Sequence, residues 1–192
     1  MNLKRSPGSE LYVALLHHPV LNKRGETIVS AITNLDLHDI ARASRTYGAE
    51  RFYVVTPLAD QARLARRIIN YWTEGQGADY NPRRAEALRL ATVKTDLDEV
   101  RNDIRLNAGD FPVVVATSAR PREQAVGFSF LKELLREKRI LLVFGTAWGM
   151  AETVLAGADY VLEPIRGRGD YNHLPVRSAV SIMLDRLVGC GI

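Results

Sequence analysis

The sequence predicts an α/β fold with a mostly parallel sheet, and two observations carry that prediction. Short runs rich in aliphatic, β-branched and aromatic residues alternate along the chain with longer segments of helical periodicity. Two of these runs end in turns that contain glycine, which is typical of strands that lead into ligand-binding loops. Because parallel strands need crossover connections, helices are expected on both faces of the sheet.

Each element follows from its own residue pattern. The runs that are short and apolar predict strands, and those with helical periodicity predict helices. We expect strands at residues 11–16, 52–56, 91–93 (a weaker run), 113–117, 140–144 and 160–162. We expect helices at residues 35–47, 60–72, 97–106, 123–138 and 173–188. Pro82 stands at a helix-start position, where its missing N–H has no cost.

Length and composition favour a single domain. The 192 residues are 46% hydrophobic, which is enough to bury a substantial core. We expect residues 1–9 to be a flexible lead-in and residues 10–192 to form the domain. The chain has no apolar run of membrane-spanning length and its start lacks the apolar segment of a signal peptide. With a single cysteine, Cys190, we expect a cytoplasmic protein without an intramolecular disulfide.

The charge pattern permits a nucleic-acid partner. The formal net charge is +4 and the arginines are clustered, with five between residues 63 and 84 and three between residues 166 and 177. Such clusters favour a basic side that contacts phosphates, although solvated helix faces would give the same pattern. The four histidines have no cysteine or glutamate at ligand spacing, so no metal site is expected.

The glycine-containing turns indicate a small-molecule site built from main chain. The run 140–144 ends in Gly145-Thr146-Ala147-Trp148-Gly149, and residues 171–178 lead directly into an apolar helix. The glycine spacing matches neither a dinucleotide fingerprint nor a phosphate loop. ATP hydrolysis and hydride transfer are therefore not expected.

These segments resemble the cofactor motifs of the SPOUT superfamily, the trefoil-knot RNA methyltransferases that use S-adenosylmethionine. The resemblance is nearest to a little-characterised bacterial branch, and it extends to residues 33–48, where the branch has its first motif. It covers about residues 11–190. It implies an α/β knot fold with a C-terminal trefoil knot. Ala147 replaces a usual glycine and Pro175 a usual serine, both in the implied cofactor wall.

The resemblance also implies the cofactor site. The loops after the strands at 113–117, 140–144 and 160–162 should meet around S-adenosylmethionine, and S-adenosylhomocysteine would be the product. The residues expected to bind the cofactor are Thr117, Ser118, Ala119, Phe144, Gly145, Thr146, Trp148, Gly149, Leu162, Pro164, Ile165, Tyr171, Asn172, His173, Leu174, Val176 and Ser178.

The acceptor side is expected on the helix at 35–47. His38, Arg42 and Arg45 share one face, because they stand at i, i+4 and i+7. The resemblance assigns Arg42 to orienting the acceptor, and Asp36, Asp39 and His38 are the candidate proton acceptors. A purely structural interpretation remains open, with an Asp39–Arg42 ion pair and Asp36 as an acid favoured by the helix dipole. The candidate RNA-binding residues are Lys23, Arg24, Arg45, Arg83, Arg84 and Arg168.

The final helix indicates a partner. Residues 179–188 are apolar nearly all round, which predicts that part of this helix packs against a second copy of the chain. We thus expect a homodimer that methylates ribosomal or transfer RNA. Two alternatives stay open: a cofactor-binding RNA module without catalysis, and an α/β protein that binds another nucleotide.

Overall fold

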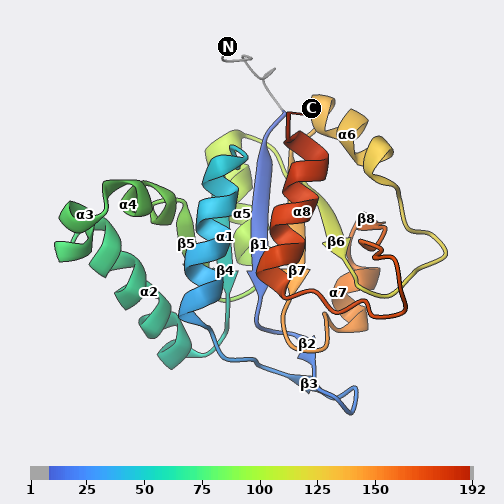
Figure 1. Ribbon diagram of the computed structural model, residues 1–192, viewed down its shortest axis with the longest axis horizontal. Coiled ribbons are helices and arrows are strands. Elements are labelled where there is room, and N and C mark those ends of the chain that lie inside the picture. Colours follow the sequence, from blue (N-terminus) through green and yellow to red (C-terminus); the bar gives the residue numbers. More distant parts are fainter. Residues whose placement is uncertain (1–8, 191–192) are drawn as a thin grey trace.

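The protein is built on a parallel six-stranded sheet (Figure 1). A computed structural model describes residues 9–190, so most of the expected lead-in lies outside the described residues. The strand order is β5-β4-β1-β7-β6-β8. The strands are β1 (Leu11–Leu16), β4 (Arg51–Val55), β5 (Ala91–Lys94), β6 (Val113–Thr117), β7 (Ile140–Gly145) and β8 (Tyr160–Leu162). All six predicted strands are confirmed to within one residue.

Helices cover both faces of this sheet, as predicted. The helices are α1 (Asn34–Thr46), α2 (Ala59–Thr73), α3 (Gln76–Tyr80), α4 (Pro82–Leu88), α5 (Leu97–Ala108), α6 (Phe128–Glu137), α7 (Glu152–Ala156) and α8 (Val176–Val188). A small antiparallel hairpin, β2 (Val20–Leu21) and β3 (Thr27–Ile28), lies outside the sheet. None of the described helices is long and apolar enough to cross a membrane.

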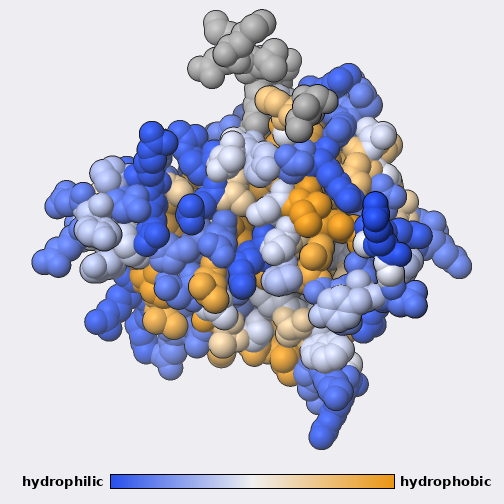
Figure 2. Space-filling view, in the orientation of Figure 1, coloured by the Kyte–Doolittle hydropathy of each residue, from blue (hydrophilic) through white to orange (hydrophobic). Residues whose placement is uncertain are grey.

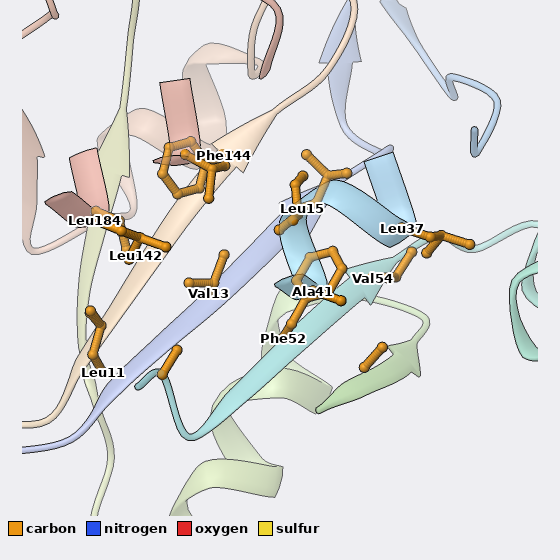
Figure 3. Close-up of a cluster of buried hydrophobic side chains, with 14 of the residues drawn as sticks. Leu11, Val13, Leu15, Leu37, Ala41, Phe52, Val54, Leu142, Phe144 and Leu184 are labelled. Carbon is orange, nitrogen blue, oxygen red and sulfur yellow. The ribbon is translucent and has the colours of Figure 1, made fainter. Parts of the chain in front are cut away.

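Side-chain alternation along β1 divides the core into two layers. Leu11, Val13 and Leu15 point toward α1 and α8, and they join a cluster that includes Leu37 and Leu184 (Figure 3). Their neighbours Tyr12, Ala14 and Leu16 point to the opposite face, where α5 and α7 pack. This period of two is a property of extended backbone. Every residue of β1 is buried, which is why its sequence is apolar without interruption.

Helix starts follow local capping signals. The side chains of Thr33, Asn81 and Asp96 accept backbone N–H groups at the starts of α1, α4 and α5. These side chains satisfy N–H groups that have no partner inside the helix. Pro82 occupies the first turn of α4, which confirms the predicted helix start.

Two predicted helices were wrong at their first residues. The helix predicted from residue 123 begins at Phe128, because Val126 instead bridges to Leu162 beside the sheet. The helix predicted from residue 173 begins at Val176, after Pro175 at the N-cap. Proline disfavours helical backbone at the residue before it, which accounts for the second difference. The sequence analysis also missed α3, α7 and the β2–β3 hairpin, which are all short.

Candidate functional site

The loops that follow β6, β7 and β8 lie together at the carboxyl edge of the sheet, as the resemblance implied. The N–H of Val126 donates to the carbonyl of Val161 (2.8 Å), and that of Glu163 donates to the carbonyl of Val126 (2.9 Å). The Asn172 amide donates to the carbonyl of Ala119 (3.2 Å). Residues far apart in sequence therefore form one edge, where α/β proteins bind their ligands.

The turn after β7 has unusual backbone geometry. Gly149 has a φ of +103°, and the non-glycine residue Ala147 has a φ of +52°. The N–H of Gly149 donates to the carbonyl of Thr146 (3.0 Å), which closes the turn. The expected glycine position thus coincides with left-handed backbone, which glycine adopts without steric cost.

The β2–β3 hairpin holds this turn in place. The N–H of Leu21 donates to the carbonyl of Gly149 (2.9 Å), and the N–H of Trp148 donates to the carbonyl of Leu21 (3.0 Å). The Thr146 hydroxyl donates to the carbonyl of Leu16 (3.1 Å) and also bonds the Ser30 hydroxyl. The turn is consequently tied to both the hairpin and the central strand.

The segment from β8 to α8 offers unused backbone donors. Within the described residues, the N–H groups of residues 165–174 donate to no other group of the chain. Trp148 and Tyr171 flank the ring of His173, with ring centroids 6.5 and 5.6 Å from it. Free donors and aromatic faces are what an adenine-containing ligand requires, so these residues fit S-adenosylmethionine.

The predicted cofactor residues divide into two groups. Phe144, Leu162 and Pro164 are buried, and Thr117 uses its hydroxyl on the carbonyl of Val143 (3.0 Å). These residues pack under the loops rather than facing a ligand. The others are half-buried or exposed and can reach a ligand: Ser118, Ala119, Gly145, Thr146, Trp148, Gly149, Ile165, Tyr171, Asn172, His173, Leu174, Val176 and Ser178.

Asp36 lies in the first turn of α1 and contacts the N-cap residue Thr33. The Thr33 hydroxyl donates to Oδ2 of Asp36 (2.6 Å) and accepts from its backbone N–H (3.1 Å). The Thr33 hydroxyl thereby satisfies one of the N–H groups that have no partner inside the helix, and its own proton is bound by the Asp36 carboxylate. The geometry thus supports the structural interpretation of Asp36.

Arg177, which the sequence analysis did not assign to the site, joins α8 to α1. Its Nε lies 3.2 Å from Oδ2 of Asp39, and its Nη1 lies 3.9 Å from Oδ1 of Asp36. Asp39 therefore pairs with Arg177, and within the described residues it makes no ion pair with Arg42, so that part of the structural interpretation does not hold. Arg177 directly follows a predicted cofactor residue, Val176. That position in the sequence could have indicated that Arg177 belongs to the site.

An open groove of about 510 Å³ runs between α1 and α8. Arg42 and Asp39 line it from α1, and Arg177 and Ser178 line it from α8. Arg42 is exposed and makes no ion pair within the described residues. The groove brings predicted acceptor residues beside a predicted cofactor residue.

His38 lies on the side of α1 that faces α2. Its ring contacts Trp72 edge-on, with centroids 5.4 Å apart. Burial lowers the pKa of His38, the nearby charge of Arg84 lowers it further, and Asp39 opposes the shift. His38 is therefore neutral near pH 7.

The candidate RNA-binding residues occupy three regions. Lys23 and Arg24 are exposed at the tip of the hairpin, which projects as a hydrophilic lobe (Figure 2). Arg168 is exposed in the segment before α8. On the helical side, Arg45 is paired with Glu86, Arg83 is exposed, and Arg84 lies over Trp72. Among the described residues, no cluster of three or more His, Cys, Asp or Glu side chains could hold a metal ion.

Solved structures with the same fold include methyltransferases. The SpoU methyltransferase AviRb of Streptomyces viridochromogenes, in complex with AdoMet, matches with a TM-score of 0.60 and 19% identity over 97% of this chain and 60% of that chain. A TrmH/SpoU tRNA modifying enzyme of A. aeolicus matches with a TM-score of 0.56 and 16% identity over 96% of this chain and 75% of that chain.

The chain is also similar in sequence to other proteins. A tRNA (guanine-N(1)-)-methyltransferase of Oleidesulfovibrio alaskensis is 45% identical over 97% of this chain but only 44% of its own length. An uncharacterised protein of Aquifex aeolicus is 43% identical over 92% of this chain and 87% of its own length. The chain thus spans less than half of the first relative. A family model described as SAM-dependent RNA methyltransferase matches residues 10–189, and the chain belongs to that family.

Proposed function

We propose that this protein methylates a nucleotide of transfer RNA, with Arg42 and Asp39 acting on the acceptor. The observation that carries the proposal is the groove between α1 and α8, where these two residues meet Ser178 at the end of the predicted cofactor segment. The tRNA substrate is supported by the names of the relatives, which are longer proteins. Ribosomal RNA is the second candidate.

The cofactor would be held by the three loops at the carboxyl edge of the sheet. When bound, S-adenosylmethionine supplies a methyl group that is already activated on its sulfonium. The free N–H groups of residues 165–174 would bind its adenine and ribose, and Trp148 and His173 would cover them. A C-terminal trefoil knot is part of this proposal.

The protein's own residues then position the acceptor and remove its proton. Arg42 has no carboxylate partner among the described residues, so its guanidinium is free to hold a phosphate or ribose oxygen. Asp39 faces the same groove, and Arg177 fixes the orientation of its carboxylate. Alignment of donor and acceptor supplies most of the expected rate acceleration. A ribose hydroxyl and a base nitrogen are both possible acceptors.

Cofactor binding is tested by titrating the protein with S-adenosylhomocysteine in a calorimeter. We expect micromolar binding, and Asn172→Ala should weaken it roughly tenfold because the loop after β6 loses its bond to the cofactor segment. Asn102→Ala, an exposed change on α5, is the matched control. Failure of the unaltered protein to bind the ligand would contradict the proposal.

Catalysis is tested with a labelled methyl donor and separate pools of transfer and ribosomal RNA. Arg42→Ala and Asp39→Asn should each lower the rate by about 100-fold or more without loss of S-adenosylhomocysteine binding. Methyl transfer to ribosomal RNA alone would replace the tRNA assignment. Cofactor binding with no transfer to either pool would favour an RNA module without catalysis.

A further inference from the structure

Helices α2, α3 and α4 form a compact unit at one end of the sheet, beside α1 (Figure 1). Two glycines allow α3 to approach α2 closely. A Cβ atom on Gly77 would lie 2.7 Å from Cε3 of Trp72, and one on Gly75 would lie 2.8 Å from the carbonyl oxygen of Tyr71. This packing fixes the position of Trp72.

Trp72 organises a cluster of four residues, which we call the Trp72 cluster: His38, Tyr71, Trp72 and Arg84. The rings of His38 and Tyr71 meet Trp72 edge-on, at 5.4 and 5.2 Å between centroids. The Arg84 guanidinium lies over the Trp72 ring, 4.4 Å from its centroid. A cation held against an aromatic face keeps its planar orientation.

Arg84 is the member of this cluster whose charge is available to a ligand. Within the described residues it makes no ion pair, whereas Arg63 is paired with Asp60 and Arg45 with Glu86. Its guanidinium is ordered by Trp72 rather than by a carboxylate, so its charge is not neutralised. Binding an anion or a base would then cost little side-chain entropy.

The surroundings of the Trp72 cluster suit a nucleic acid. The exposed rings of Tyr71 and Tyr80 and the exposed Arg83 lie on the same three-helix unit, whose α3–α4 end is hydrophilic in Figure 2. On its other side the cluster reaches α1 through His38, which stands next to Asp39 in the sequence and one turn before Arg42. Aromatic rings and cations therefore lead from α3 toward the proposed acceptor site.

We propose that the Trp72 cluster and the neighbouring Tyr80 and Arg83 bind unpaired nucleotides that flank the methylated position. Bases of unpaired nucleotides can stack on tyrosine rings and on the Arg84 guanidinium, while phosphates pair with the arginines. A duplex keeps its bases stacked inside and offers these rings no face. This inference rests on the proposed RNA substrate and specifies its conformation at this surface.

The test is fluorescence anisotropy with a labelled RNA of about ten nucleotides, alone and annealed to its complement, across a salt series. We expect the single strand to bind at least about tenfold more tightly than the duplex, because only its bases can stack on the protein. Arg84→Gln should weaken the single strand roughly tenfold and reduce the salt slope by about 0.7, the value for one lost phosphate contact. Arg63→Gln is the control, because Arg63 is already paired with the carboxylate of Asp60. It should change neither the affinity for the single strand nor the salt slope.

Further variants separate stacking from charge. Arg84→Lys should keep the salt slope but lose affinity, because an ammonium does not stack as a planar guanidinium does. Tyr71→Ala with Tyr80→Ala should lower affinity by roughly tenfold or more at an unchanged slope. Equal binding of duplex and single strand, or wild-type binding by Arg84→Gln, would overturn the proposal. S-adenosylhomocysteine titration of the same variants reports separately on the cofactor site.

Discussion

Among residues 9–190, Ala147 is the non-glycine residue with left-handed backbone. Its φ of +52° lies in the left-handed region, in the turn that follows β7. A Cβ atom in that region contacts the backbone unfavourably, at a cost of about 1–2 kcal/mol. The bonds from the β2–β3 hairpin to Trp148 and Gly149 on the same turn hold the backbone there.

Ala147→Gly is expected to stabilise the protein by about 0.5–1 kcal/mol, since relief of the strain exceeds the added entropy of the unfolded chain. Urea unfolding followed by circular dichroism measures the change. Ala43→Gly, inside α1, should instead destabilise by about 1 kcal/mol. A lower unfolding midpoint for Ala147→Gly would show that the turn gains nothing from glycine.

His17 is a buried polar residue at the carboxyl end of β1. Its side chain is completely buried, and neither ring nitrogen makes a hydrogen bond. Burial lowers the pKa of His17 from 6.5 to about 4, while the charge of Asp36 and the carbonyls of Leu15 and Val55 oppose that shift. The folded state consequently holds the neutral imidazole.

Because the folded pKa lies below the unfolded value, His17 costs no stability above pH 6.5, and stability is lost as the pH falls from 6.5 toward 4. At about pH 5 the loss should reach roughly 2 kcal/mol. Urea unfolding at about pH 7.5 and pH 5 should show this loss in the wild type but not in His17→Leu. Equal losses in both proteins would assign the pH dependence to other groups.

At the scale of elements, β7 meets its following turn at Gly145 with no space for a side chain. A Cβ atom there would lie 2.5 Å from Cγ of Met150 and 2.8 Å from its backbone nitrogen. Met150 also bridges to Val20, so its backbone is held by the hairpin. The strand, turn and hairpin therefore pack closely against one another at this point.

Gly145→Ala should destabilise the protein by about 1–3 kcal/mol, because the backbone of Met150 must shift. Gly169→Ala is the matched control, since its Cβ would meet nothing within 4 Å. Thermal unfolding of both variants measures the difference. An unchanged midpoint for Gly145→Ala would show that the turn relaxes freely.

At the scale of the whole molecule, we predict that the interface of the expected homodimer lies along the groove between α1 and α8. Ile182 and Ala43 line it together with Arg42 and Arg177. A dimer through this groove would place the proposed acceptor residues of one copy beside the other copy. The apolar face of α8 first suggested such an interface.

Gel filtration at low and high salt should give an apparent mass near twice the chain mass of 21.4 kDa. Ile182→Asp should shift the protein to the monomer, because transfer of a carboxylate from water into the interface costs free energy. Leu106→Asp, on the exposed side of α5, should leave the dimer intact. A monomeric wild type would contradict the predicted homodimer.

The amino-acid sequence by itself determined the class of the fold, its six sheet strands and the membership in the methyltransferase family. Strand and helix periodicities are local, and motifs such as Gly145-Thr146 or Thr33-x-x-Asp36 carry their geometry in a few neighbouring residues. The short hairpin and α3 were missed, because elements of two to five residues depend on contacts made elsewhere.

Only the tertiary structure decided which side chains meet. Arg177 of α8 pairs with Asp39 of α1, and the Arg84 guanidinium of α4 lies over the Trp72 ring of α2. The β2–β3 hairpin bonds to Gly149 in the turn after β7. None of these contacts follows from spacing, since each joins elements whose relative placement is set by packing on the sheet. The roles proposed for Arg42 and Asp39 depend on that placement, because the groove that joins them to α8 exists only in the folded chain.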